Sequence, residues 1–357
     1  PTPVSYVGGL NAQSTTAATS NPSMSFTSAP SVFESGGDYY NVVWTTSDTA
    51  SGYVEYTYKG TKYQLWDEVG GYRRTYDTIH TVKVPKEHLN NNKYRVISFH
   101  MTKHEAYSYT RGDCIYSPYY LFEDHSGNEN VTMLALPDIK ADTYSDALTK
   151  LQSAVAALGT NPAIIVAHGD VVNNLVTTTN LETFFKATAA ASGSSHPIIF
   201  ARGNGECRGG NATKLMSYIP TVNDKFYYSY NYGKYTIAVL DTAEDKADDH
   251  AEYSGLVDFD ALRVEQTEWL KNLNVPKGNE LIVISHFSYL NNYFGLDWAS
   301  ILDQKGALLV LTGHNRQFNT PITSGVLDVM CGGYASNNTF IATEILVGGK
   351  RQRHRYC

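Results

Sequence analysis

The chain has 357 residues, of which 42% are hydrophobic and 18% are charged, a balance typical of a globular protein long enough for two domains. Its formal net charge of −7 argues against a nucleic-acid partner, because neutralising phosphates requires a basic face. The sequence contains no apolar run approaching the roughly 20 residues that a membrane-spanning helix needs.

The first 29 residues are rich in Ser, Thr, Ala, Asn and Pro and contain few large apolar side chains. Such a segment cannot bury enough surface to fold alone. We expect residues 1–29 to form a polar arm, either a flexible leader or a segment that pairs with a sheet edge on a neighbouring copy. The chain begins with Pro1 rather than Met, which suggests that a signal peptide has been removed and that the protein is secreted.

Sequons and cysteines support the same localisation. Sequons for N-linked glycans begin at Asn130, Asn211 and Asn337. Four cysteines could form two disulfides in three pairings, or one or more of them could be buried free thiols. The cysteines are Cys114, Cys207, Cys331 and Cys357. An even cysteine count beside sequons favours an extracellular glycoprotein.

Residues 30–127 are predicted to form an all-β sandwich of the immunoglobulin or fibronectin III type. Short runs with β-branched or aromatic residues at every second position alternate with Gly- and Asn-rich turns. These runs cover residues 41–45, 52–57, 78–84 and 93–98. The histidines of this region are scattered, and we interpret them as structural or solvated; they are His80, His100 and His104.

Residues 128–357 change to alternating strand-like and helix-like segments. Apolar residues at helical spacing predict helices over residues 145–158, 181–191 and 263–273. Short β-branched runs between them predict strands buried on both faces. The pattern indicates an α/β layered domain, with a basic and solvated tail at residues 350–355.

Five of these strand-like runs end in side chains that can bind metal ions. Because the carboxyl ends of buried parallel strands meet at one edge of a sheet, such side chains come together where α/β proteins bind ligands. Two metal ions held by such a set clamp a phosphoryl group and acidify a bridging water. The residues are Asp138, Asp170, Asn204, His286 and His314.

The order Asp, Gly-Asp, Gly-Asn, His, Gly-His resembles the metallophosphoesterase (calcineurin-like) superfamily. The preceding sandwich resembles its purple-acid-phosphatase-like branch, and the resemblance covers residues 33–348. It implies that Asp170 bridges two metals and that the second metal also takes Asn204, His286 and His314. It implies that the first metal takes Asp138, Asp170, a Tyr three residues after the bridge, and the last His of Gly-His-x-His.

Three positions depart from the family pattern. Asn173 stands at the Tyr position, and Arg316 stands at the final His position although a guanidinium has no lone pair for a metal. Gly205 replaces a His that, by resemblance, binds phosphate or protonates the leaving group. Glu206, which follows it, has no ligand role in the pattern and is interpreted as structural.

The flanks of Asp138 also depart, since Pro137 and Lys140 stand where the family has glycines. Lys140 and Arg316 could neutralise the carboxylates of Asp138 and Asp170 with fixed positive charge. A site that has exchanged a cation for a basic side chain no longer needs the metal and would repel it.

These departures predict a secreted protein with the phosphatase fold and a decayed two-metal site. It would be inactive and would act as a structural, binding or self-assembling extracellular component. The alternative is a single-metal phosphoesterase that hydrolyses phosphate esters. We expect at most one divalent or trivalent ion (Zn, Fe or Mn), or none if the two histidines are only hydrogen-bonded structural residues.

Tyrosine is used heavily, with 27 residues that include a dense run at 227–232. Tyr brings a large contact area with few rotatable bonds, and it is favoured at binding surfaces. The pattern is also compatible with ordinary strand packing. We expect self-association through the N-terminal arm and Tyr-rich surfaces.

Overall fold

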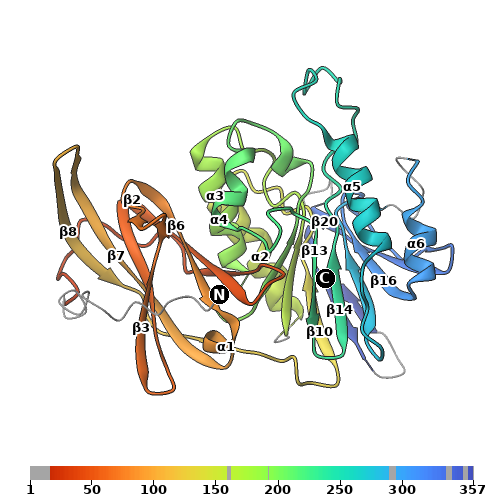
Figure 1. Ribbon diagram of the computed structural model, residues 1–357, viewed down its shortest axis with the longest axis horizontal. Helices are drawn as coiled ribbons and strands as arrows, with labels where there is room; N and C mark the ends of the chain where they lie inside the picture. Colours follow the sequence, from red (N-terminus) through yellow and green to blue (C-terminus); the bar gives the residue numbers. More distant parts are fainter. Residues whose placement is uncertain are drawn as a thin grey trace.

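The structure, a computed structural model, describes residues 17–158, 162–191, 193–288, 295–334, 340–348 and 353–356. A region of long strands lies at one end of the molecule, and a region of strands and helices lies at the other (Figure 1). The functional interest is in the second region, because all five predicted strand-end residues belong to it.

Two sheets form the centre of the α/β region. The first sheet contains three parallel strands, β10 (Val131–Ala135), β11 (Ile164–His168) and β12 (Ile198–Ala201). Beside β10, two antiparallel strands extend the sheet: β22 (Thr343–Val347) and then β23 (Arg353–Tyr356). The basic C-terminal run was expected to be a solvated tail, and this is wrong for β23, because its backbone extends the sheet edge.

The second sheet is built around the parallel strands β14 (Tyr235–Val239), β15 (Glu280–Ile284), β16 (Ala307–Thr312) and β19 (Val326–Cys331). One edge carries β13 (Tyr228–Tyr232), antiparallel to β14. Short strands β17 (Phe318–Asn319) and β18 (Ile322–Thr323) pair with β19 at the other edge, and β20 (Gly333–Tyr334) pairs with β21 (Phe340–Ile341). Apolar side chains of both sheets pack against each other in one cluster, so the sheets lie face to face.

Helices cover the outer faces of both sheets. α2 (Tyr144–Leu158) and α3 (Thr178–Ala190) pack on the first sheet, while α5 (Phe259–Lys271) and α6 (Trp298–Gln304) pack on the second. α3 begins after a capping box in which Thr177 accepts from the Asn180 amide. The α/β layers and three of their helices were thus predicted correctly. Among the described residues, no helix is both long and apolar enough to cross a membrane.

The N-terminal region is mostly strands, and its longest strand differs from expectation. Runs at residues 41–45 and 52–57 were predicted as separate strands, but both belong to β2 (Tyr39–Tyr58). β2 pairs with β6 (Asp77–Pro85) along its first half and with β7 (Asn92–Glu105) along its second, with a register shift after Thr45. The strand continues because it changes partners rather than ending in a turn. Its other neighbours are β1 (Ser31–Glu34) and β3 (Thr61–Trp66), β7 also pairs with β8 (Ser108–Tyr116) and β9 (Tyr120–Phe122), and β4 (Glu68–Val69) pairs with β5 (Tyr72–Arg73).

The two regions are joined by hydrogen bonds rather than by a bare linker. Strand β1 pairs parallel with β12 through Phe33 and Ile198, so it continues the first sheet into the N-terminal region. The Tyr94 hydroxyl donates to the Ser194 carbonyl at 2.7 Å, and the Glu123 amide donates to the Ser195 carbonyl at 2.9 Å. The loop before β12 is therefore held by the N-terminal strands.

The described part of the predicted arm is docked on its own chain. Met24 is buried against Ala50 and Ile115, and Phe26 forms an antiparallel bridge with Thr46. The Thr19 amide also donates to the Cys114 carbonyl at 2.9 Å. The expectation that residues 1–29 remain undocked is therefore wrong for residues 17–29, since one Met supplies apolar burial that composition had concealed. Residues 1–16 lie outside the described residues.

The structure also bears on the cysteines and on the tyrosine run. Of the two alternatives for the cysteines, the buried free thiols are confirmed at positions 114, 207 and 331, so two disulfides do not form; Cys357 lies outside the described residues. Burial raises the pKa of the Cys207 thiol well above its ordinary value. The tyrosines at positions 227, 228, 230 and 232 are buried, so this run packs inside the molecule instead of forming a binding surface.

Candidate functional site

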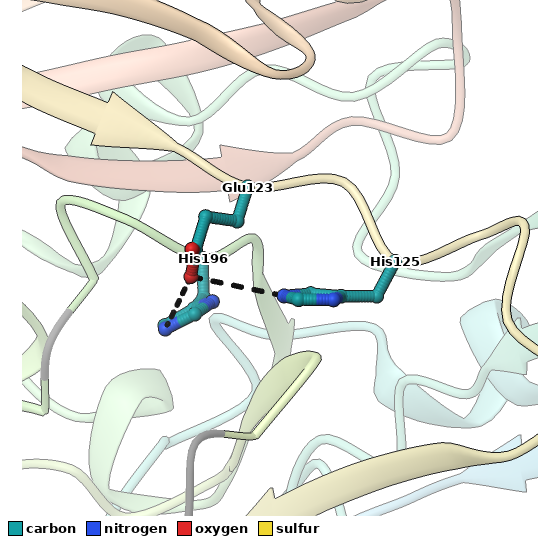
Figure 2. Close-up of side chains that lie close together, drawn as sticks. All are labelled: Glu123, His125 and His196. Carbon is teal, nitrogen blue, oxygen red and sulfur yellow. Dashed lines mark ion pairs between the residues drawn. The ribbon is translucent and has the colours of Figure 1, made fainter.

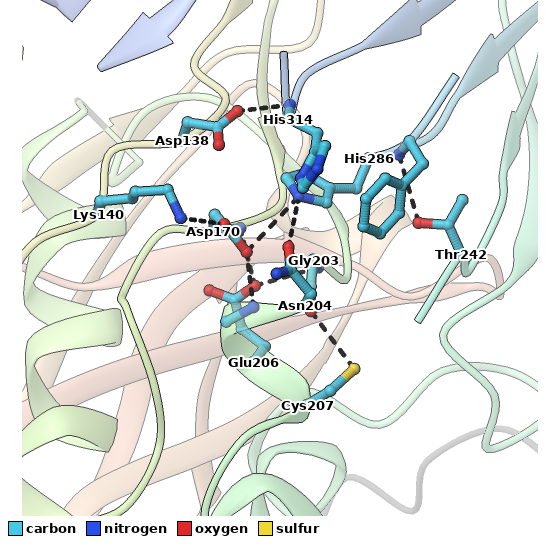
Figure 3. A network of polar contacts seen from close by, with 12 residues as sticks. Asp138, Lys140, Asp170, Gly203, Asn204, Glu206, Cys207, Thr242, His286 and His314 are labelled. Carbon is cyan, nitrogen blue, oxygen red and sulfur yellow. Dashed lines mark hydrogen bonds and ion pairs between the residues drawn. The ribbon is translucent and has the colours of Figure 1, made fainter. Parts of the chain in front are cut away.

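The five predicted residues follow the carboxyl ends of β10, β11, β12, β15 and β16 and gather in one place (Figure 3). Four of them are buried, and the His314 side chain is 30% exposed. Because the two sheets lie face to face, strand ends from both contribute to the same site. The residues gathered there are Asp138, Asp170, Asn204, His286 and His314.

Asp170 lies at the centre of the group and is fully buried. Its Oδ1 accepts from the Gly205 amide at 2.6 Å and lies 3.6 Å from Nε2 of His286. Its Oδ2 forms an ion pair with Nζ of Lys140. Burial raises the pKa of Asp170, but the nearby His286, the charge of Lys140 and the hydrogen bonds to its oxygens outweigh burial and lower it. The carboxylate is therefore ionised and already has a positive partner.

His286 is oriented by the strand beside it. Its Nδ1 lies 2.9 Å from the His168 carbonyl, which can only accept, so Nδ1 carries the proton. Its Nε2 faces the Asn204 amide at 3.1 Å. When the Asn204 amide is turned, its nitrogen donates to both Asp170 Oδ1 and His286 Nε2, and its oxygen accepts from Arg208 at 3.1 Å. Asn204 thus satisfies its neighbours through its N–H group rather than its oxygen.

Asp138 is close to the group but poorly partnered. Its Oδ2 accepts from the His314 amide at 2.6 Å. Its Oδ1 is buried without a hydrogen-bond partner among the described residues, and the nearest cation is Arg316 Nε at 3.8 Å. Burial and the charge of Asp170 raise the pKa of Asp138 to about 6, against the lowering effects of His286 and Lys140. Lys140 therefore contacts Asp170 more closely than Arg316 contacts Asp138.

Metal-binding capacity differs between the two halves of the site. One atom from each of Asp170, His286 and His314 lies within 4.8 Å of the others, as the second metal position would require. Burial and His286 lower the pKa of His314 to about 4, which keeps its ring neutral. Neutral imidazoles beside a carboxylate suit zinc, iron or manganese. The donors of this half fit one ion.

The other half does not fit an ion. Nδ2 of Asn173 donates to Asp142 Oδ1 at 2.6 Å, so its side chain serves the neighbouring loop. Arg316 is 43% exposed and has no lone pair to offer. The ammonium of Lys140 contacts Asp170 Oδ2, the oxygen on the side away from His286 (Figure 3). A cation at that oxygen would meet a fixed positive charge.

The backbone at the site is unusually bent. Several non-glycine residues have positive φ angles, a conformation that costs roughly 1 kcal/mol or more for an L residue and clusters at functional sites. Lys140 has φ of +47°, at a position where the resemblance implies glycine. The other residues are Asp138, Asp170, His314 and Arg316, with φ between +50° and +63°. The strand ends thus keep a sharply turned geometry.

Gly205 cannot simply be changed back to histidine. A Cβ atom placed there would lie 2.3 Å from the Val172 carbonyl oxygen and 3.0 Å from Asp170 Oδ1. Real Cβ atoms do not approach backbone oxygens this closely, so the loop would have to move. The backbone of the site is therefore incompatible with a histidine at this position.

Glu206 has a larger role than its sequence context suggested. It is fully buried, and its two carboxylate oxygens accept from the amides of Asp170 at 2.9 Å, Val172 at 3.2 Å and Gly203 at 3.1 Å. It therefore fixes the loops after β11 and β12 against each other. Its interpretation as structural is consistent with these contacts, but two of the three backbone donors, those of Asp170 and Val172, are distant in sequence and could not be foreseen.

A charged rim beside the site was also missed. Glu244 is buried, accepts from Arg208 at 2.9 Å and from the Tyr253 hydroxyl at 2.7 Å, and pairs with Lys246 at 3.5 Å. Burial opposes its ionisation, but hydrogen bonds from Asp245 and Tyr253 and the charge of Arg208 lower its pKa to about 2. Because Arg208 also faces Asn204, this rim connects to the strand-end residues.

Sequence and structure comparisons agree with this geometry. The sequence model of the calcineurin-like phosphoesterase family matches residues 125–315, which include all five strand-end residues. The chain belongs to the calcineurin-like phosphoesterase family. No curated protein sequence matches it.

Among solved structures, this calcineurin-like phosphoesterase chain is similar to the purple acid phosphatase PPD1 from seeds of yellow lupin (Lupinus luteus). The TM-score is 0.60 at 16% identity, over 92% of this chain and 71% of that chain. Weaker matches include phosphopantetheinyl hydrolase (PptH) from Mycobacterium tuberculosis (TM-score 0.42, 12% identity, 57% of this chain and 89% of that one). Another is GAP50, the anchor in the inner membrane complex of Plasmodium (TM-score 0.41, 14% identity, 64% and 84%). The lupin match shows the fold of a purple-acid-phosphatase-like chain.

The stability of the site should depend on the titration of Glu206. Burial and the charge of Asp170 raise the pKa of Glu206 to about 7, above its ordinary value of 4.5. The folded state then holds the proton more tightly than the unfolded state, so this stabilisation is complete below about pH 4.5 and is lost as pH rises to about 7. Denaturant unfolding of Glu206→Gln should lack this fall. Equal pH slopes for wild type and variant between pH 4.5 and 7 would contradict the assignment.

Proposed function

We propose that this phosphoesterase-fold protein is an extracellular binding or structural component whose two-metal site no longer hydrolyses phosphate esters. The observation that carries the proposal is the ion pair between Lys140 Nζ and Asp170 Oδ2. The lysine side chain is 13% exposed and the aspartate is fully buried, so the pair is largely shielded from water. A built-in cation at the bridging carboxylate serves the electrostatic role of a metal but cannot supply a reactive water.

Loss of the first metal position would remove most of the family chemistry. Metal ions contribute several kcal/mol of charge stabilisation and generate the nucleophile at neutral pH. Here Arg316 stands at 3.8 Å from Asp138 in place of a ligand, and Asn173 is bonded to Asp142. These contacts support a site stabilised by side-chain charge.

Loss of the histidine at position 205 would act on a second step. Proton transfer to a leaving group by a positioned side chain contributes roughly 10²–10⁴ in rate. Gly205 has no side chain, and the Val172 carbonyl fills the space beside it. Because catalytic groups act as a unit, their losses are not additive, but either loss would disable the family mechanism.

A single-metal phosphoesterase is the second candidate. Its support is the convergence of Asp170, His286 and His314 on one point, together with the neutral form that burial gives His314. A bound ion would polarise a phosphoryl oxygen there. Asn204 could join this set only by directing its oxygen inward, away from Arg208.

The N-terminal region is proposed to be the fibronectin III- or immunoglobulin-type sandwich of the purple-acid-phosphatase-like branch. Support comes from the lupin match, which extends over 92% of this chain, and from residues 31–122, which are mostly strands. This region would present binding surface rather than chemistry, because the strand-end residues all belong to the α/β region.

Glycosylation and secretion are proposed on narrower support. Asn130 is exposed, as an acceptor of a glycan must be. Asn211 is buried, and its Nδ2, the atom that would carry a glycan, donates to the Val176 carbonyl at 3.0 Å. Asn337 lies outside the described residues. We therefore propose Asn130 as the glycan acceptor among the two described sequons.

Self-association is supported by an exposed tyrosine patch at the outer end of the N-terminal region. Tyr72 and Tyr109 bond through their hydroxyl groups, and His104 packs between Tyr76 and Tyr109. Tyr107, beside them in sequence, is fully exposed. Aromatic residues are enriched where proteins bind one another. Strand β8, which carries Tyr109, lies at the opposite end of the molecule from α5 and α6 (Figure 1).

Removing the built-in cation should restore metal binding at a cost in stability. In Lys140→Gly, the buried Asp170 loses its partner, which should destabilise the metal-free protein by about 3 kcal/mol, while its affinity for Zn²⁺ should increase. The matched control is Lys59→Gly, since Lys59 also has φ of +47° but forms an exposed ion pair with Glu87. Denaturant unfolding and calorimetric zinc titration measure both effects. Weaker zinc binding by Lys140→Gly than by wild type would refute the charge-replacement idea.

Hydrolysis assays decide between the two candidate functions. With Fe, Zn or Mn added, the wild-type protein should hydrolyse a generic phosphomonoester no faster than the metal in buffer, and metal analysis should give at most one ion at this site. His286→Ala should remove that ion, while His250→Ala, in an exposed loop, should retain it. Turnover that is lost in His286→Ala and kept in His250→Ala would instead establish the single-metal phosphoesterase.

Assembly should depend on residues 1–16 and on the tyrosine patch. Analytical ultracentrifugation of a deletion lacking residues 1–16, and of Tyr107→Ser, should show fewer chains per particle than in the wild-type protein. Met24 remains in the deletion, so the docked segment stays intact. An unchanged number of chains per particle in both variants would contradict self-association through these segments.

A further inference from the structure

A second group of metal-ligating side chains lies at the junction of the two regions (Figure 2). Glu123 and His125 belong to the segment between β9 and β10, where the chain passes from the N-terminal strands into the α/β region. His196 belongs to the loop between α3 and β12. None of the three is among the strand-end residues, so this group is separate from the site described above.

The three side chains converge on one point. Oε2 of Glu123 lies 3.8 Å from Nε2 of His125 and 3.9 Å from Nε2 of His196. One ligand atom from each of the three residues lies within 4.8 Å of the others. Figure 2 shows the carboxylate with its oxygens directed toward both rings.

These distances are longer than hydrogen bonds and close to those between ligands of one ion. Zinc binds His nitrogen and carboxylate oxygen at about 2.0–2.2 Å, which places neighbouring ligands of a tetrahedral site roughly 3.4 Å apart. Both ion-pair distances exceed this value by about half an ångström. Small side-chain rotations would therefore complete the geometry without backbone movement.

The histidines have coordination capacity that protein contacts leave unused. His196 is 4% exposed, and Nε2, the ring nitrogen that faces Glu123, lies 3.9 Å from its carboxylate, beyond hydrogen-bond distance. Nε2 of His125, which also faces Glu123, is buried without a hydrogen-bond partner among the described residues. Buried polar atoms are rarely left unpaired, and an ion is one accepted reason for such a group.

The backbone already holds the three residues in place. The Glu123 amide donates to the Ser195 carbonyl at 2.9 Å, which ties the first residue to the neighbour of the third. The His125 amide donates to the Tyr232 hydroxyl at 3.1 Å. The ligands are therefore positioned by contacts that do not depend on a metal, as a specific site requires.

A simple ion-pair cluster explains the group less well. It would require a protonated ring beside Glu123, but His125 and His196 stack with ring centres 6.0 Å apart, so two charged rings would repel each other. Burial lowers the pKa of His196, against the raising effect of Glu123, so neutral imidazole is favoured. Two neutral imidazoles and one carboxylate are a ligand set for a divalent transition metal.

We infer that Glu123, His125 and His196 bind one divalent transition-metal ion of the zinc class, with water in the remaining position. The ion would join the segment leaving the N-terminal strands to the loop entering β12. It would thus be a structural ion that stabilises the contact between the two regions. Its binding free energy would add to the free energy of folding.

The experiment uses the full chain and separates this ion from any ion at the strand ends. His286→Ala removes a ligand of the strand-end site and serves as the background. After chelator treatment and dialysis against Zn²⁺, this variant should retain one zinc per chain and unfold at a higher temperature than its metal-free form. Adding His125→Ala should remove both the zinc and the thermal shift. Adding His104→Ala, at the opposite end of β7 from the junction, should preserve both.

A conservative variant and a spectroscopic probe guard against misfolding. Glu123→Gln keeps the side-chain shape and removes the charge, so in the same background it should weaken zinc binding at least tenfold. Co²⁺ should give the visible absorption of a tetrahedral ion in the His286→Ala protein and not after His125→Ala. The inference is overturned if the His286→Ala protein retains no zinc, or if it retains equal zinc with and without His125. Neither result depends on whether the strand-end site hydrolyses phosphate.

Discussion

The buried charge of Asp170 is the constraint on which the site depends. A carboxylate fully removed from water needs a partner, and removing that partner costs several kcal/mol. In this chain the Lys140 ammonium, the Gly205 amide and the side-chain amide of Asn204 contact the carboxylate as one cation and two N–H donors. A site built this way remains folded without an ion, which relaxes the requirement for the other ligands. Asn173 and Arg316, which the family resemblance places at the first metal position, are then compatible with the fold.

The backbone geometry of the site matches the family pattern more closely than its side chains do. Glu206 binds three backbone amides, and three of the strand-end residues, Asp138, Asp170 and His314, have left-handed backbone bends. At Gly205 a Cβ atom would lie 2.3 Å from the Val172 carbonyl oxygen, so the backbone has no room for a side chain there. A histidine at this position would require the loop to move.

Much of this arrangement could be predicted from local sequence. Buried strands that end in polar residues give the positions of all five site residues, because parallel strands place their carboxyl ends together. What escaped prediction depends on contacts distant in sequence. β2 continues because it changes partners, Met24 is buried by residues 26 and 91 positions away, and Glu206 binds amides in another loop. The cysteine pairing failed for the same reason, since an even count says nothing about separation in space.

Strand β12 connects the two groups of ligand residues. His196 precedes its amino end, Asn204 follows its carboxyl end, and its four residues are all buried. β1 pairs with this strand from the N-terminal region, and β11, which leads to Asp170, pairs with it on the other side. A fully buried four-residue strand cannot slide or tilt without disturbing the core on both faces. The position of Asn204 relative to Asp170 is thus fixed partly by the N-terminal region. That region therefore contributes to the geometry of the site, although it supplies none of the strand-end residues.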